Sequence, residues 1–246
     1  MKTAVITGAG SGIGKAFAEK LAEKGYRTIL VGRNINALNA VASSLVNAEV
    51  FCADLGILEN CTRLFNSYNE ADMIINCAGS GVTGEFWNTD MEAELSMLDI
   101  NIRALHVLTR LFTEAFVTRG SGCVLNVSSS AAFFPGPLFA SYYASKSYVY
   151  RLTTSVHDEL RHKRSNVKVS VLCPGPVDTE FNSKAGVKAG KGAVSAEFIA
   201  EKALRNLGKR VIIPGFGIKC TKVLADVFPE RLMSVINYKL QINKRK

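Results

Sequence analysis

Short apolar runs alternate along this chain with longer segments in which apolar residues recur every three or four positions. The apolar runs lie at residues 3–8, 26–33, 48–55, 71–79, 122–130, 166–177 and 210–215. Runs this short, with few polar residues inside them, are typical of strands that are buried on both faces of a parallel sheet. The pattern therefore predicts seven strands.

The segments between these runs have the spacing of amphipathic helices. They lie at residues 14–25, 35–46, 57–68, 92–120, 141–163 and 195–209. Helices that connect parallel strands cross over in the right-handed sense, so they cover both faces of the sheet. We therefore expect an α/β fold of three layers, a doubly wound parallel sheet of the Rossmann type, with residues 1–246 in a single domain.

The composition narrows the class of protein. It is 48% hydrophobic and 21% charged, which is an ordinary globular mixture. The cysteines form no CxxC pair, so the sequence indicates neither a zinc site nor a disulfide framework, and we expect a reducing cytoplasm. The chain opens directly into its first apolar run, without the features of a signal peptide, and no apolar stretch reaches the ~20 residues of a membrane span.

Positive charge is concentrated in the last quarter of the chain. Residues 1–183 carry 16 Lys and Arg against 17 Asp and Glu, whereas residues 184–246 carry 14 against 4. From about residue 216 to 246, apolar residues at helical spacing alternate with basic ones, which defines a basic C-terminal extension. Three interpretations stay open for it: binding of an anionic part of a substrate, peripheral contact with an anionic membrane, or a solvated face that closes a subunit contact.

A glycine-rich turn, TGAGSGIG at residues 7–14, joins the first predicted strand to the first predicted helix. Glycines lack a side chain, so the chain can turn sharply and its N–H groups can approach a pyrophosphate. The start of a helix also carries a partial positive charge. At the beginning of a strand–turn–helix unit, this pattern favours dinucleotide binding.

With four further stretches, the chain resembles the short-chain dehydrogenase/reductase family. These are NCAG at 76–79, Asn101 in the long helix, YYASK at 142–146 and PGPVDT at 174–179. The resemblance covers residues 3 to about 181 and implies a nicotinamide cofactor. It places the cofactor contacts at Gly8, Gly10, Ser11, Gly12, Ile13, Gly14, Arg33, Asp54, Leu55, Asn76, Ala78, Gly79, Tyr142, Lys146, Pro174, Gly175, Val177 and Thr179.

The end of the second strand decides which nicotinamide cofactor is expected. An acidic residue there binds both hydroxyls of the adenosine ribose, whereas an arginine accommodates a 2′-phosphate. The strand ends with Gly32 and Arg33 and offers no carboxylate at this point. A guanidinium can bind phosphate in a bidentate manner, so we expect NADP(H) in preference to NAD(H).

Tyrosine and lysine lie one helical turn apart in SYYASKSYV, residues 141–149. A nearby ammonium stabilises a phenolate, so we expect Lys146 to lower the pKa of a tyrosine. Tyr142 and Tyr143 both meet the spacing, at four and three residues. The family motif YxxxK selects Tyr142, and the resemblance places the partner serine at Ser129. Ser128 and Ser130 flank it as alternatives. Because neighbouring residues of a strand face opposite sides, we do not expect Ser128 to share the role of Ser129.

The resemblance implies hydride transfer between the nicotinamide and a carbonyl carbon. Tyr142 exchanges the proton, Ser129 polarises the substrate oxygen, Lys146 holds the nicotinamide ribose, and Asn101 keeps a water in the proton relay. We therefore expect an NADP(H)-dependent oxidoreductase, most simply a ketone or aldehyde reductase. The alternative is a catalytically idle NADP(H)-binding regulator or scaffold.

The sequence says less about the substrate site than about the cofactor site. Phe86, Phe133, Phe134 and Phe139 are candidates either for an apolar pocket wall or for core packing, and a substrate loop is expected at about 179–195. The long helices resemble those that pair subunits in this family, so we expect a homodimer or homotetramer. The histidines have no metal-ligand spacing, and we expect neither a metal ion nor a nucleic acid partner.

Overall fold

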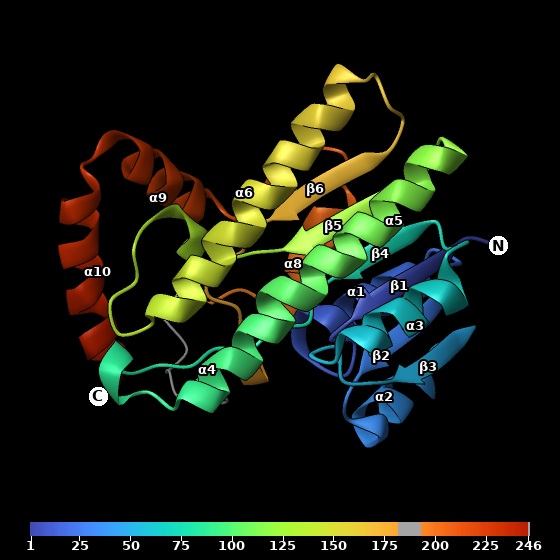
Figure 1. The fold of residues 1–246 in the computed structure, drawn as a ribbon, viewed down its shortest axis with the longest axis horizontal. Helices are drawn as coiled ribbons and strands as arrows, with labels where there is room; N and C mark the ends of the chain where they lie inside the picture. Colours follow the sequence, from blue (N-terminus) through green and yellow to red (C-terminus); the bar gives the residue numbers. More distant parts are fainter. Residues whose placement is uncertain (182–192, 246) are drawn as a thin grey trace.

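The structure is a computed structural model, and it describes residues 1–181 and 193–245, with side chains as far as residue 242. Residues 182–192 of the expected substrate loop lie outside the described part. Figure 1 shows a central sheet covered by helices on both faces, with the chain ending in two helices at one side of the molecule.

All seven predicted strands are present and pair in parallel, which confirms the expected fold. They are β1 (Thr3–Thr7), β2 (Arg27–Gly32), β3 (Ala48–Cys52), β4 (Met73–Asn76), β5 (Cys123–Val127), β6 (Lys168–Leu172) and β7 (Val211–Ile212). Their order in the sheet is β3-β2-β1-β4-β5-β6-β7. The order reverses between β1 and β4, and ligands bind doubly wound sheets beyond the carboxyl ends of the strands at such a point.

The helices largely follow the predicted segments. They are α1 (Gly12–Ala22), α2 (Ile35–Ala42), α3 (Leu58–Tyr68), α4 (Met91–Leu98), α5 (Leu105–Arg119), α6 (Ala140–His162), α8 (Ala196–Leu204), α9 (Phe216–Val227) and α10 (Glu230–Arg245). Short 3₁₀ helices lie at Phe86–Asn88 (η1) and Ser130–Phe133 (η3).

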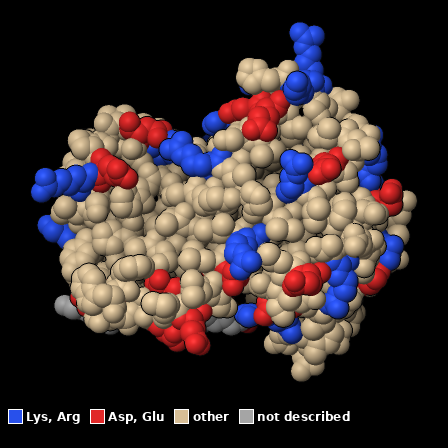
Figure 2. Space-filling model, viewed as in Figure 1, with Lys and Arg blue, Asp and Glu red and all other residues tan. Residues whose placement is uncertain are grey.

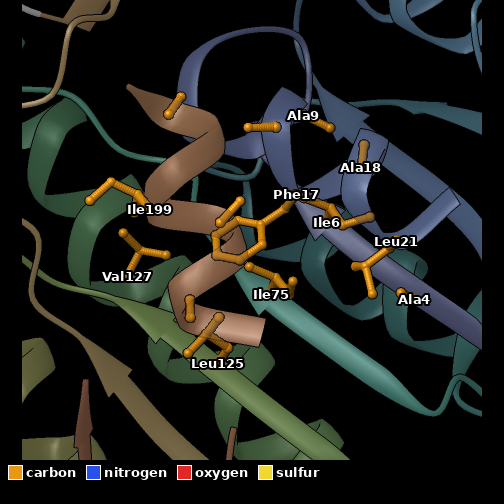
Figure 3. Close-up of a cluster of buried hydrophobic side chains, with 14 of the residues drawn as sticks. Ala4, Ile6, Ala9, Phe17, Ala18, Leu21, Ile75, Leu125, Val127 and Ile199 are labelled. Atoms are coloured by element: carbon orange, nitrogen blue, oxygen red, sulfur yellow. The ribbon is translucent and has the colours of Figure 1, made fainter. Parts of the chain in front are cut away.

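One face of the sheet packs against α1 and α8. Ala4 and Ile6 of β1 point to this side, where Phe17 of α1 and Ile199 of α8 are completely buried. Figure 3 shows Phe17 between the sheet and α8. Removing so large a buried ring leaves a cavity, so this contact holds α1 and its N-terminal turn against the sheet.

The other face packs against α3 and α5. Val5 of β1 and Ile74 of β4 alternate with the residues of the first face and belong to one buried cluster with Phe112 and Phe116 of α5. Alternation along each strand therefore fills two cores, as a sheet buried on both sides requires.

The long predicted helix at 92–120 is interrupted. A π-helical segment, η2 (Asp99–Ala104), lies between α4 and α5. Such a segment shifts the residues after it around the helix and is frequent at functional sites. It contains Asn101, whose side chain is fully buried.

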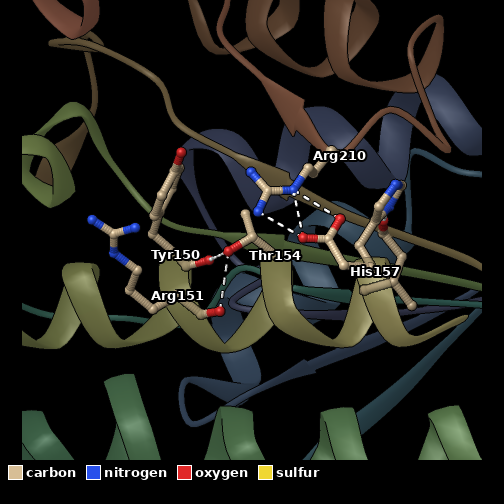
Figure 4. Close-up of polar contacts among 7 residues, drawn as sticks. Tyr150, Arg151, Thr154, His157 and Arg210 are labelled. Atoms are coloured by element: carbon tan, nitrogen blue, oxygen red, sulfur yellow. Dashed lines mark hydrogen bonds and ion pairs between the residues drawn. The ribbon is translucent and has the colours of Figure 1, made fainter. Parts of the chain in front are cut away.

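An ion pair ties the short last strand to α6. Arg210, which precedes β7, binds the carboxylate of Asp158 through Nε at 3.0 Å and Nη2 at 2.8 Å (Figure 4). On the same helix, His157 Nδ1 lies 2.7 Å from the Val169 carbonyl of β6. These contacts fix α6, the helix that carries the tyrosine–lysine pair, against the end of the sheet.

Candidate functional site

A cleft of about 390 Å³ lies at the carboxyl ends of β1, β4, β5 and β6, close to the point where the strand order reverses. Its size is that of a small-molecule site. Most of the site residues expected from the sequence line it: Gly8, Ser11, Gly12, Ile13, Gly14, Arg33, Ala78, Gly79, Ser129, Tyr142, Lys146, Pro174, Gly175, Val177 and Thr179.

The glycine-rich turn forms one wall. Gly12 has φ +53°, a left-handed conformation, and begins α1. A Cβ on Gly14 would lie 2.2 Å from the Gly8 carbonyl oxygen, so only glycine allows this close packing. The first turn of α1 contains no acidic residue, and its positive end faces the cleft beside Ser11. This is a suitable environment for an anion.

Arg33 lines the cleft directly after β2, as expected. Its guanidinium also lies 3.6 Å from the Asp54 carboxylate, and both side chains are well exposed. Asp54 accepts a hydrogen bond from Gly56 N at 2.9 Å, which shapes the loop after β3. Asp54 therefore lies beside the cleft rather than on its wall, and its neighbour Leu55 is buried in the core.

Two more expected cofactor residues do not line the cleft. Gly10 packs toward α2, where an added Cβ would lie 3.3 Å from the side chain of Ala37. Asn76 is buried at the end of β4, and its Nδ2 donates to Asn126 Oδ1 at 2.8 Å. Asn126 is its register partner on β5 and binds Thr153 of α6. Asn76 thus joins the sheet to α6 and supports the site from behind.

Tyr142 lies in the first turns of α6 and lines the cleft, with its ring stacked on Phe139 at a centroid distance of 4.3 Å. Burial raises its pKa above the ordinary value, the Ser129 hydroxyl lowers it, and Tyr143 raises it further. The expected lowering of this pKa by Lys146 is therefore not found: desolvation decides the direction. The phenol is protonated at neutral pH.

Lys146 is buried in the same cleft, with its Nζ 5.7 Å from the centroid of the Tyr142 ring. Its ammonium donates to the Val127 carbonyl at 3.2 Å. Burial lowers its pKa to about 8. The site thus holds a lysine that changes charge close to physiological pH.

The serines at the end of β5 have separate roles, as strand geometry predicts. Ser129 lines the cleft, accepts a hydrogen bond from Ala131 N at 3.1 Å and interacts with the Tyr142 hydroxyl. Ser128 is buried, and its hydroxyl donates to the Lys146 carbonyl at 2.7 Å. Ser128 therefore holds α6 in place, while Ser129 is available to a molecule bound in the cleft.

Asn101 is not on the cleft wall. Its amide nitrogen donates to the Ser80 carbonyl and to Ser145 Oγ, and its oxygen accepts from Ser80 N, all at 3.0 Å. Ser145 in turn donates to the Tyr142 carbonyl. The π-helical segment therefore turns Asn101 inward to connect the loop after β4 with the helix turn that carries Tyr142.

The cleft contains residues beyond the expected site: Tyr143, which the sequence offered only as an alternative to Tyr142, and two residues that it did not indicate, Phe181 and Gln241. Tyr143 lines the cleft beside Tyr142, and Gln241 of α10 reaches it from the C-terminal extension. Phe181 contributes a further aromatic ring, 5.5 Å from that of Tyr142. Nothing in the local sequence of α10 distinguishes Gln241, because its position depends on how the whole extension folds back.

Among the phenylalanines expected at a pocket wall, Phe139 lines the cleft. Phe86 is 63% exposed on η1. Phe133 and Phe134 pack instead against Tyr150 and Tyr143, at centroid distances of 5.8 and 6.1 Å.

The residues present fit a nicotinamide dinucleotide. The N-terminus of α1 would hold a pyrophosphate, Arg33 lies where an adenosine ribose would end, and Lys146 and Tyr142 lie at the other end of the cleft. Within residues 1–181 and 193–242, no group of three or more His, Cys, Asp or Glu side chains could hold a metal ion. In the described part of the chain, no helix is long and apolar enough to span a membrane.

Comparison with known proteins agrees with this geometry. Residues 2–189 match the family model described as short chain dehydrogenase. An uncharacterized oxidoreductase of Staphylococcus epidermidis is 35% identical over 184 residues, which cover 72% of this chain and 79% of that protein.

Two similar structures contain different cofactors. A short-chain dehydrogenase from Sphingobium yanoikuyae in complex with NADPH is 28% identical, with a TM-score of 0.84 and 95% of each chain covered. A short-chain dehydrogenase/reductase from Burkholderia phymatum in complex with NAD is 25% identical, with a TM-score of 0.83, and covers 91% of this chain and 92% of its own.

Proposed function

Because this chain belongs to the short-chain dehydrogenase/reductase family and is an oxidoreductase of that family, we propose that it reduces a ketone or aldehyde with NADPH. The observation that carries the proposal is the convergence of Ser129, Tyr142 and Lys146 on one end of the cleft. A protein that only binds a dinucleotide has no need of all three.

The roles follow from the surroundings of each side chain. When bound, the nicotinamide supplies the hydride. Tyr142, held protonated by burial, donates its proton to the carbonyl oxygen as negative charge develops there. Ser129 donates a hydrogen bond to the same oxygen, and Lys146 provides positive charge behind the phenol. A protonated tyrosine favours the reductive direction.

Arg33 supports NADPH as the cofactor. It lines the cleft after β2, and its guanidinium is exposed and able to bind a 2′-phosphate. Asp54 is close enough to Arg33 to pair with it, so a phosphate would compete with this carboxylate.

An NADPH-oxidation screen over diketones, aldehydes, steroid ketones and acyl thioesters tests the proposal. We expect turnover of at least one class by the wild-type protein and loss of that turnover in Tyr142→Phe. Tight NADPH binding without turnover of any class would instead support the alternative, an idle NADP(H)-binding regulator or scaffold.

We further propose that the protein is a homodimer or homotetramer built on α4, α5 and α6. Large side chains stay exposed on these helices: Leu95, Val117 and Tyr148 are 55%, 48% and 37% exposed. The centre of the view in Figure 2, where α5 and α6 face the reader, carries few charged side chains. Light scattering at micromolar concentration checks this, and a mass of one chain would refute it.

The cytoplasmic location stays a prediction, and membrane contact of residues 216–246 stays one of three interpretations of the basic extension. In favour of the contact, Val223 of α9 and Val235 and Leu240 of α10 are at least half exposed and lie among basic residues. Co-sedimentation of the protein with anionic and neutral liposomes, with and without residues 218–246, tests the membrane contact. Absence of binding, or binding that does not depend on salt, would refute the membrane contact.

A further inference from the structure

Helix α10 buries two polar side chains against the protein and leaves several apolar side chains exposed. Asn237 and Gln241, four residues apart on one face, are each 5% exposed. Leu232, Val235 and Leu240 are 45%, 50% and 53% exposed. Burying a polar side chain costs free energy unless the side chain is hydrogen-bonded. Asn237 and Gln241 should therefore have hydrogen-bond partners on the protein.

The buried polar side chains form a chain of contacts that ends in the cleft. Asn237 Nδ2 donates to the Pro135 carbonyl at 2.9 Å, and its Oδ1 accepts from the Tyr143 hydroxyl at 3.4 Å. Gln241 Nε2 donates to the same hydroxyl at 2.7 Å. Asn237 anchors α10 to the loop before α6, while Tyr143 and Gln241 both line the cleft.

Tyr143 is held firmly. A Cβ on Gly136 would lie 2.1 Å from the ring of Tyr143, so the ring packs directly against the backbone there. Burial raises the pKa of Tyr143, and its contacts with Asn237 and Gln241 lower it. At neutral pH the site therefore presents a fixed phenol rather than a phenolate.

Tyr143 and Gln241 together form a neutral polar pair with both kinds of hydrogen-bonding group. The amide nitrogen of Gln241 has two N–H groups, of which the contact with Tyr143 uses one. The amide and phenol oxygens are acceptors. A hydroxyl, which donates and accepts, matches such a pair. The cationic residues described on the cleft wall are Arg33 and Lys146, which belong to the cofactor and the catalytic group.

Between the catalytic phenol and this pair, the wall is aromatic. Phe139 stacks on Tyr142, Phe181 lies 5.5 Å from it, and the rings of Tyr142 and Tyr143 are 6.2 Å apart. A bound substrate would therefore meet a proton donor, an apolar surface and then a neutral polar pair.

We propose that Tyr143 and Gln241 form a subsite that selects ketones with an apolar body and a second, neutral oxygen group, a hydroxyl above all. This inference rests on the proposed reductase function. It assigns Gln241, which lies in the C-terminal extension beyond the residues 2–189 matched by the family model, to substrate selection.

Matched ketone pairs test the inference: 4-(4-hydroxyphenyl)-2-butanone against 4-phenyl-2-butanone, and 3-hydroxyandrostan-17-one against androstan-17-one. For the pair that the wild-type protein turns over faster, we expect kcat/KM of the hydroxylated ketone to exceed that of its partner by about tenfold. The factor is modest because each hydrogen bond to the protein replaces one to water. In Gln241→Leu and in Tyr143→Phe this ratio should fall to about one. Val235→Ala, on the exposed face of α10, is the matched control and should keep the wild-type ratio.

Binding gives a readout that does not depend on turnover. Calorimetry with the NADPH-loaded Tyr142→Phe variant should show the same preference, and adding Gln241→Leu should remove it. Circular dichroism and NADPH fluorescence check that each variant folds and holds the cofactor. A ratio near one in wild type, an unchanged ratio in both subsite variants, or preference for a carboxylated analogue would overturn the subsite. Absence of turnover with intact, Gln241-dependent binding would instead remove the reductase proposal alone.

Discussion

The charge of Lys146 leads to a prediction about pH. Burial lowers the pKa of this lysine to about 8, and its ammonium lies in the cleft 5.7 Å from the Tyr142 ring. A lowered lysine pKa means that the protonated form is lost as pH rises through about 8, well below the ordinary value near 10.4. The protonated fraction falls from about 90% at pH 7 to about 10% at pH 9.

We therefore expect kcat/KM for NADPH to fall about tenfold between pH 7 and pH 9, because this parameter reports the ionisation of the free enzyme. The assay is initial-rate NADPH oxidation with a saturating ketone in buffers of constant ionic strength. Lys146→Arg keeps a positive charge at all these pH values, so the inflection should disappear from the variant's profile, whatever its absolute rate. A flat wild-type profile, or the same inflection in the variant, would refute the reasoning.

Three further predictions concern the cofactor wall and its support. Arg33→Ala should raise KM for NADPH about tenfold or more and leave KM for NADH nearly unchanged, because only NADPH offers a 2′-phosphate to this guanidinium. Steady-state kinetics with both cofactors will measure this difference. Gly14→Ala should abolish dinucleotide binding, measured by NADPH fluorescence, since the new Cβ would collide with the Gly8 carbonyl; retained affinity would contradict the described turn. Asn101→Ala should lower the free energy of unfolding by roughly 1–3 kcal/mol, because the Ser80 N–H and carbonyl lose their partner, and chemical denaturation will measure it.

The strands, and the placing of Tyr142 and Lys146 in one cleft, were predictable because each depends on local patterns. Buried parallel strands appear as apolar runs, and the YxxxK spacing brings Tyr142 and Lys146 to one face of α6 in any regular helix. The choice of Tyr142 over Tyr143, and the choice of Ser129, came from the family resemblance and not from the local pattern.

Other features depend on the assembled molecule. The direction of the Tyr142 pKa shift follows from burial, and the rings that pack on Tyr142, those of Phe139 and Phe181, come from parts of the chain that are distant in sequence. The inward turn of Asn101 needs a π-helical segment that the apolar pattern does not mark. Gln241 enters the cleft only because α10 folds back on the Pro135 loop, about a hundred residues earlier in the chain.

The most direct test of the account is the rate of hydride transfer in Tyr142→Phe. Stopped-flow absorbance at saturating NADPH and ketone measures this step, and NADPH fluorescence measures cofactor affinity separately. The account predicts that the rate falls by about 10²–10⁴-fold, the usual contribution of a positioned proton donor, while NADPH affinity stays close to the wild-type value. A variant that reduces the ketone at the wild-type rate would contradict the assignment of Tyr142 as the proton donor.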